Sequence, residues 1–452
     1  MTELAARPIE RRIEFDIARE QLLKQHSRLH RAAGRKLPAT HRPLRDGACG
    51  ESDSDATRRC TDALHHLLAY RGRPAAEIDA IIADHPHSVF AHCLRLAVIV
   101  RDDNRAAQAA LAASIAAIKV TGSGASDRAR RHAAAASLWL TRDAARALEA
   151  YGAIVAEQPL DSLALAVAHA LDFRLGNRRL LRDRIAEAIR SWDSAMPGYA
   201  AILAMYAFGL EENGAYRHAE RLARRALTIE PGLSPAIHVL AHVMEMQGRP
   251  REGLDFLAAN EAAWAEGNGF SIHLAWHRAL FHLQLNDVAA ALAVYDAQIA
   301  GPSSPNLAAL ADASALLWRL QLRNIDLGAR WRRLADRWEN ARLTQARPFF
   351  IVHAVMAFAA TGRTEAATRL LATLPPVDLS EATRILPEHA LAPPVCEALL
   401  AFAADDYAAC IANLERVRHI ANRCGGSLAQ CELLQLTFAE ATQRARKARL
   451  AA

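Results

Sequence analysis

Residues 234–296 read SPAIHVLAHVMEMQGRPREGLDFLAANEAAWAEGNGFSIHLAWHRALFHLQLNDVAAALAVYD. Apolar residues recur there at helical spacing and short polar breaks interrupt them, which predicts two helical hairpins in succession. The first helix of each hairpin carries two histidines four residues apart, which places each pair on one face of its helix. The pairs are His238 with His242 and His273 with His277, and Glu245 continues the first stripe three residues later.

A repeat emerges when the hairpins are aligned on the turn residue that precedes a small residue by five positions. Successive turns then lie 34 to 43 residues apart, and the small residues let paired helices approach closely. After Gly214, Ala219, Ala226 and Pro231 follow at the spacing of a 34-residue tetratricopeptide repeat, and the proline ends the second helix. The aligned pairs are Gly214/Ala219, Gly248/Gly253, Asn286/Ala291, Asn324/Ala329, Gly362/Ala367 and Asp405/Cys410, with an earlier turn at Gly176.

The fold class that follows is all-α. We predict an α-solenoid of tetratricopeptide-like hairpins over residues 56–445, wound into a right-handed superhelix, because no segment alternates with the period of a strand. Residues 1–55 contain clustered glycines, prolines and an acidic-serine run. These breaks predict a flexible, basic amino-terminal extension.

Composition limits the compartment and the partners. The 452 residues contain no apolar run near the roughly 20 needed to cross a bilayer, and no secretory leader pattern is found. The seven cysteines form no CxxC pair, which predicts free thiols in the cytoplasm. The net charge of +6 gathers largely in the first 45 residues, where a solvated extension is a better interpretation than a nucleic-acid-binding arm.

Several motifs give the chain a family likeness. HVLAHVMEMQGRPREGLDFL from His238, WAEGNGFSIHLAWHRALFHL from Trp264 and ALAVYD resemble the tetratricopeptide repeat protein 38 family. AHALDFRLGNRRLLRDR, MPGYAAILAMYAFGLEENG, DASALLWRLQL and CGGSLAQCELL extend the resemblance over about residues 60–440. It implies an α-solenoid without an established activity. The chain departs from the family after Gly425, where it has Leu428, Cys431 and Glu432 in place of a more polar stretch.

The register of the repeat predicts which way the histidines face. In tetratricopeptide arrays the first helix of each hairpin lines a concave groove, so one stripe of polar residues on successive first helices converges on one cavity. Residues between the stripes, such as Ala241 and Met244, are expected to pack between helices. A groove residue fills no core volume, so replacing His242 with Ala is expected to change stability little. The predicted ligand-binding residues are His238, His242, His273, His277, His353 and Glu212.

The spacing His-x3-His is a metal-ligand spacing on a helix, and it occurs twice on neighbouring helices. It predicts a divalent metal held by His238, His242, His273 and His277. Nitrogen and carboxylate ligands without thiolate suit Zn²⁺, Fe²⁺ or Mn²⁺. Glu245 is then a candidate general base. A simpler interpretation makes the histidines ordinary lining residues of an amphipathic groove without a cofactor, and the HExxH motif of zinc proteases is absent.

Two classes of function remain open from the sequence. One is a solenoid that binds a small molecule or a peptide in a His/Glu-lined groove through a divalent metal. Its catalytic variant is a hydrolytic or oxidative enzyme in which Glu245 is the base and metal-bound water the nucleophile. The alternative is a non-catalytic protein–protein scaffold, the ordinary use of such arrays. No Ser/His/Asp order, Walker loop or dinucleotide fingerprint occurs.

Overall fold

The structure is a computed structural model, and its described residues are all helix, turn or loop. They are residues 54–451 apart from 103, 122–124, 266–269, 302–306, 342, 344–345, 375–390 and 418–424, and no strand occurs among them. The all-α prediction is confirmed. The predicted extension over residues 1–55 lies outside the described residues except for its last two. Within the described part, no helix is long and apolar enough to span a membrane.

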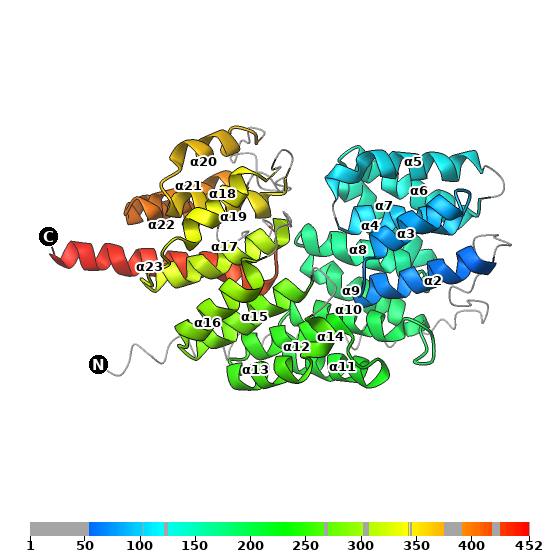
Figure 1. Ribbon diagram of the computed structural model, residues 1–452, viewed down its shortest axis with the longest axis horizontal. Helices are drawn as coiled ribbons and strands as arrows, with labels where there is room; N and C mark the ends of the chain where they lie inside the picture. The colour runs from blue at the N-terminus through cyan, green and yellow to red at the C-terminus, as the bar shows by residue number, and fades with distance from the viewer. Residues whose placement is uncertain are drawn as a thin grey trace, which may run out of the picture. The chain divides into compact units, whose positions relative to one another are not determined.

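The helices follow one another as antiparallel neighbours (Figure 1). The amino-terminal half contains α2 (Ser54–Ala69), α3 (Pro74–Asp84), α4 (Val89–Arg101), α5 (Gln108–Val120), α6 (Asp127–Leu140), α7 (Ala144–Glu157), α8 (Ser162–Arg174), α9 (Arg178–Ala188), α10 (Tyr199–Glu211) and α11 (Tyr216–Ile229). Short 3₁₀ turns occur at η2 (Arg105–Ala107) and η4 (Ile189–Ser191).

The carboxyl-terminal half continues the series from the two histidine-bearing hairpins onward. It contains α12 (Ser234–Met246), α13 (Pro250–Ala259), α14 (Glu261–Trp264), α15 (Phe270–Gln284), α16 (Val288–Val294) with a π-helical turn η5 (Tyr295–Ile299), α17 (Leu307–Leu322), α18 (Arg330–Glu339), α19 (Pro348–Ala360), α20 (Thr364–Leu371), α21 (Ala392–Ala403), α22 (Tyr407–Val417) and α23 (Leu428–Ala451).

The first helix of each hairpin ends at a turn residue whose backbone is in the left-handed region. All seven aligned turn residues have φ between 58° and 71°, a range that glycine, asparagine and aspartate tolerate best. At Gly248 the turn closes with two backbone bonds, Arg249 N to Met244 O (2.9 Å) and Gly248 N to Glu245 O (3.1 Å). This is a Schellman C-cap. Tyr70 and Arg142 adopt the same conformation between α2 and α3 and between α6 and α7, and neither residue type signals it in a sequence.

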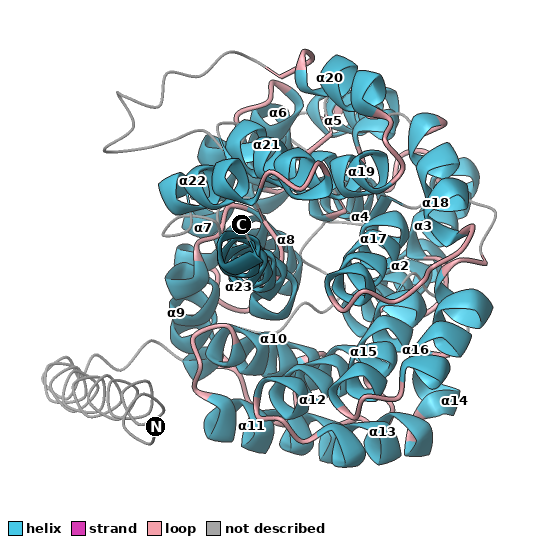
Figure 2. Cartoon of the chain, turned by 90° about the vertical axis from the view of Figure 1, so that its left-hand side faces the viewer, coloured by secondary structure: helices cyan, strands magenta, loops and turns pink. Residues whose placement is uncertain are grey.

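First helices pack on first helices, as the repeat register predicts. Contacts run in order from α10 to α12, α15, α17, α19 and α21. Figure 2 shows this row on the inner side of the array and α11, α13, α16 and α18 on the outer side. Buried small residues allow the close approach, namely Ala219, Ala226, Gly253, Ala291, Ala367 and Cys410. Ala329 is less buried, because residues 325–329 form a longer connection before α18.

The last helix, α23, occupies the inner side, where the sequence predicts a concave groove. It packs against α17, α22 and α12 (Figure 2). Arg319 Nη2 on α17 donates to the Ala429 carbonyl (2.6 Å), and Trp318 Nε1 donates to Thr437 Oγ1 (2.9 Å). The helix also runs past residue 445, the predicted end of the solenoid. The concave side that the sequence predicts as a groove is therefore occupied by the chain itself beside α12 and α17.

Gly253 provides a test of this packing. A Cβ built on it would lie within 3.0 Å of three ring carbons of Phe281, which is fully buried on α15. Gly253→Ala should therefore lower the free energy of unfolding by about 1–3 kcal/mol, the usual effect of overpacking. Urea unfolding followed by circular dichroism measures it. Gly301→Ala, where the added Cβ meets only one atom at 3.7 Å, is the control and should change little. Equal midpoints for the two variants would contradict this packing.

Candidate metal centre

Four histidines from two neighbouring helices meet in the interior of the array. His238 and His242 come from α12 and His273 and His277 from α15, and we call them the four-histidine cluster. One ring nitrogen from each lies within 4.8 Å of the others. In a tetrahedral zinc site, bonds of about 2.0–2.1 Å place ligand nitrogens about 3.4 Å apart, so small side-chain rotations close this arrangement around one ion. The structure thus brings together all four predicted metal ligands.

The cluster is buried and its nitrogens lack hydrogen-bond partners. His242 and His277 are fully buried and His238 is 8% exposed, whereas the side chain of His273 is 17% exposed. Nε2 of His238, His242 and His277, and Nδ1 of His242, find no hydrogen-bond partner among the described residues. Leaving a buried polar group unpaired costs about 1–3 kcal/mol. His132, His169 and His353, which lie elsewhere, each leave one buried ring nitrogen unpaired among the described residues as well. The cluster differs in that its unpaired nitrogens lie close together and in that His242 leaves both unpaired.

Acidic side chains face the Nδ1 atoms of three of these histidines. His277 Nδ1 lies 2.6 Å from Glu245 Oε2, and His273 Nδ1 lies 2.9 Å from Asp312 Oδ2 on α17. His242 Nδ1 lies 3.5 Å from Glu211 Oε2 on α10. An ionised carboxylate at Nδ1 accepts the proton of that nitrogen and leaves the lone pair of Nε2 for a metal. The contacts at His277 and His273 have hydrogen-bond length, whereas the longer contact at His242 is not a hydrogen bond.

Burial sets the charge of the empty cluster. It lowers the pKa of His242 to about 3 and the pKa values of His238 and His277 well below the ordinary value. It also raises the pKa values of Glu245 and Glu211 to about 8. The rings of His238, His242 and His277 are consequently neutral at pH 7, the state in which imidazole binds metals. A cation among them would offset the cost of ionising the buried carboxyls beside it.

Two adjacent glutamates lie near His242, and only one of them, Glu212, is predicted from the sequence. Glu212, the predicted ligand-binding residue, pairs with Arg178 Nε (3.2 Å) and accepts a hydrogen bond from Leu428 N (3.0 Å). Its neighbour Glu211 is the carboxyl that faces His242. Glu211 lies three residues before the turn glycine Gly214, as Glu245 lies three before Gly248, so the repeat register was the signal for it. Glu211, Glu212 and His242 also form a second close group of ligand atoms.

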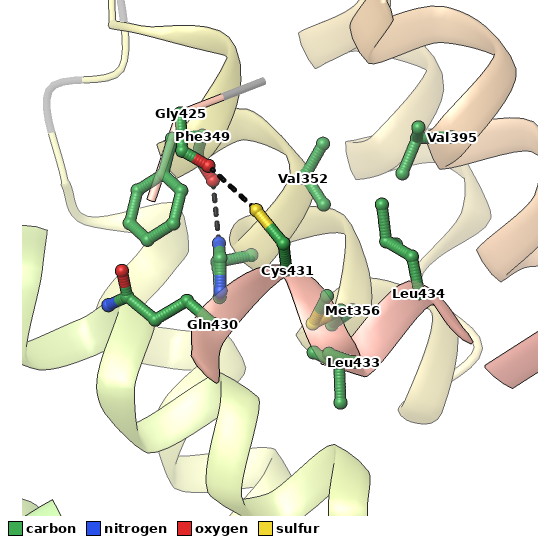
Figure 3. Close-up of a pocket in the computed structure, with 10 residues that line it drawn as sticks. Phe349, Val352, Met356, Val395, Gly425, Gln430, Cys431, Leu433 and Leu434 are labelled. Atoms are coloured by element: carbon green, nitrogen blue, oxygen red, sulfur yellow. Dashed lines mark hydrogen bonds between the residues drawn. The ribbon is translucent and has the colours of Figure 1, made fainter. Parts of the chain in front are cut away.

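His353 lies outside the four-histidine cluster. Its Nδ1 hydrogen-bonds to the Phe349 carbonyl one turn earlier (2.7 Å). It lines a mainly apolar pocket between α19 and α23, with Val352, Met356, Cys431 and Leu433 (Figure 3). Burial raises the pKa of the Cys431 thiol to about 11, so at neutral pH it is neither a thiolate ligand nor a nucleophile. The pocket therefore offers packing surface rather than reactive groups.

Five tryptophans of these repeats are buried, namely Trp264, Trp276, Trp318, Trp331 and Trp338. Trp276 also forms one wall of the cluster, because its ring stacks on His273 with centroids 5.3 Å apart and planes 13° apart. The guanidinium of Arg319 lies 5.4 Å from the centre of the same indole ring. Together they cover the most exposed histidine of the cluster with a flat, rigid surface.

Comparison with known proteins locates the fold only in general terms. No family model matches the chain. A chain of the crystal structure of the APC/C hetero-tetramer Cut9-Hcn1 is similar over 84% of this chain and 70% of its own length, with 14% identity and a TM-score of 0.38. The P58(IPK) TPR domain is similar over 87% of this chain and 99% of its own length, with 13% identity and a TM-score of 0.22. At these scores the likenesses say nothing about function.

The unpaired buried nitrogens of His242 should lower the stability of the metal-free protein. His242→Leu removes two of them in a side chain of similar volume, so it should raise the free energy of unfolding by about 1–2 kcal/mol in the presence of a chelator. Urea unfolding measures it. The control is His132→Leu, because His132 is equally buried but hydrogen-bonded to Asp161 (3.0 Å), and this variant should be destabilised. Equal destabilisation of both would mean that His242 is an ordinary core residue.

Proposed function

We propose that this protein is a helical-repeat scaffold that holds one divalent transition-metal ion in the four-histidine cluster. The observation that carries the proposal is that Nε2 of His238, His242 and His277 is buried and unpartnered among the described residues. Two of these rings, His242 and His277, also have an acid at the opposite nitrogen, as His273 does. A protein core gains nothing from such an arrangement, whereas a metal site requires it. The two His-x3-His pairs supply the four nitrogens.

The donor set favours Zn²⁺ or Fe²⁺ over Mn²⁺, because imidazole suits the former and oxygen ligands suit the latter. Four protein ligands complete a tetrahedral coordination shell, which is typical of structural rather than catalytic sites. Glu245, the candidate general base, is engaged by His277 at 2.6 Å. We therefore assign Glu245 the role of positioning His277, and the non-catalytic alternative becomes the better description of the site.

The scaffold part of the proposal rests on the repeat itself. Stacked hairpins present extended surfaces to protein or peptide partners, which is the ordinary use of such arrays. A small-molecule ligand has less support, because the inner side next to the cluster is covered by α23. The motifs around the two histidine pairs support membership of the tetratricopeptide repeat protein 38 family. On this proposal, relatives that keep both pairs bind a metal as well.

Metal binding is tested on full-length protein purified without a histidine tag and stripped with a chelator. Titration with ZnCl₂ in a calorimeter should show one ion per chain. Zinc at about 100 times its dissociation constant should stabilise the fold by about 2.7 kcal/mol, because only the folded state assembles the site. His242→Leu should abolish both effects.

The matched control for this titration is His282→Ala. His282 lies on α15 with His273 and His277 but outside the cluster, beside Asp287. This variant should bind zinc as the wild type does. Wild-type protein that neither binds nor is stabilised by Zn²⁺ or Fe²⁺ would refute the proposed function and leave only the scaffold.

A further inference from the structure

Three consecutive residues at the start of α23 contact residues that surround the four-histidine cluster. Leu428 N donates to both carboxylate oxygens of Glu212 (3.0 and 3.3 Å). The Ala429 carbonyl accepts from Arg319 Nη2 (2.6 Å). Gln430 Nε2 lies 3.3 Å from Asp312 Oδ1. One turn of helix thus contacts three of the charged side chains on the first helices α10–α17.

The contact with Asp312 is the most direct route to the site. Asp312 bridges α23 and the cluster, since one carboxylate oxygen faces Gln430 and the other faces His273 Nδ1 (2.9 Å). Gln430 also closes a capping box with Ser427, in which Ser427 N donates to Gln430 Oε1 (3.0 Å) and Gln430 N to Ser427 Oγ (3.3 Å). The side chain that holds Asp312 is therefore the one that defines the start of the helix.

Arg319 provides a second route. Its guanidinium binds the first turn of α23 and also lies over Trp276, whose indole stacks on His273. Displacement of α23 would free Arg319 to move and would change the surroundings of both acids that orient α15 histidines.

We infer that docking of α23 on the inner face and metal binding in the four-histidine cluster are coupled, each favouring the other. The inference rests on the proposed function. A metal at Nε2 of His273 binds more tightly when Asp312 stays fixed at Nδ1 and orients the ring. Gln430 holds the other oxygen of the Asp312 carboxylate and so keeps it in place. Because coupling of two binding events is reciprocal, the metal that α23 helps to bind must in turn hold α23 in place. Metal binding then stabilises the docked position of α23 on the inner face.

The experiment uses the full chain, with zinc as the probe. Hydrogen exchange of the α23 amides is measured with and without Zn²⁺, and zinc affinity is measured by competition with a chelator dye. Gln430→Ala removes the contact with Asp312, and Gln435→Ala is the control, because Gln435 is exposed on the same helix. Zinc should slow exchange in α23. Gln430→Ala should weaken zinc binding about 10-fold, the lower end of what loss of an outer-shell partner costs, while Gln435→Ala leaves it unchanged.

The outcomes separate the two proposals. Zinc-dependent protection of α23, lost together with affinity in Gln430→Ala, supports the coupling. If the wild type binds zinc but exchange in α23 is unchanged, and Gln430→Ala binds like the wild type, the coupling is refuted and the metal site stands. If the wild type binds no zinc, both fail. Thermal unfolding of each variant confirms that it is folded, so a loss of affinity is not a loss of structure.

Discussion

The proposed site depends on one constraint. Four imidazole rings lie side by side in the interior, with too few hydrogen-bond partners among the described residues. The ring centroids of His238 and His242 lie 4.3 Å apart and those of His242 and His277 lie 4.5 Å apart, so neutral rings are required there. Protonating several at once would place like charges in contact in a dry environment. On our proposal, a cation at the centre of the cluster offsets the cost of burying these rings. By contrast, buried His132 in the amino-terminal half is paired through Nε2 with Asp161, which also binds Arg128, and only its Nδ1 is unpaired among the described residues.

The contacts between acids and histidines follow largely from equivalent positions in successive repeats. Left-handed turn residues end each first helix at an equivalent place, so side chains at equivalent distances from the turn face the same neighbouring helix. A glutamate three residues before one turn therefore meets a histidine on the next first helix, and this happens twice: Glu211 faces His242 and Glu245 faces His277. The third acid, Asp312, comes from the helix that follows and faces His273. Two of the three contacts thus arise from translation of one unit along the array, and the third, from Asp312, is made in the opposite direction.

The fold and the histidines could be predicted from the sequence because both depend on local spacing. A turn residue and a pair four residues apart are visible without knowledge of distant partners, and the repeat extends them to neighbouring helices. Contacts distant in the chain carry no such signal. Gln430 meets Asp312 and Leu428 meets Glu212 across more than a hundred residues, so the covering of the inner face by α23 was missed. Tyr70 and Arg142 were missed for another reason, because their side chains do not favour the left-handed conformation that tertiary packing imposes on them.

The central claim is that four imidazoles, and no other side chains, hold the metal. X-ray absorption at the zinc edge of the loaded, full-length protein tests it most directly. The account predicts four nitrogen neighbours at about 2.0–2.1 Å with the outer-shell scattering of imidazole rings. A sulfur neighbour at about 2.3 Å, or a shell of oxygens with fewer than three imidazoles, would contradict it and would place the ion elsewhere in the chain.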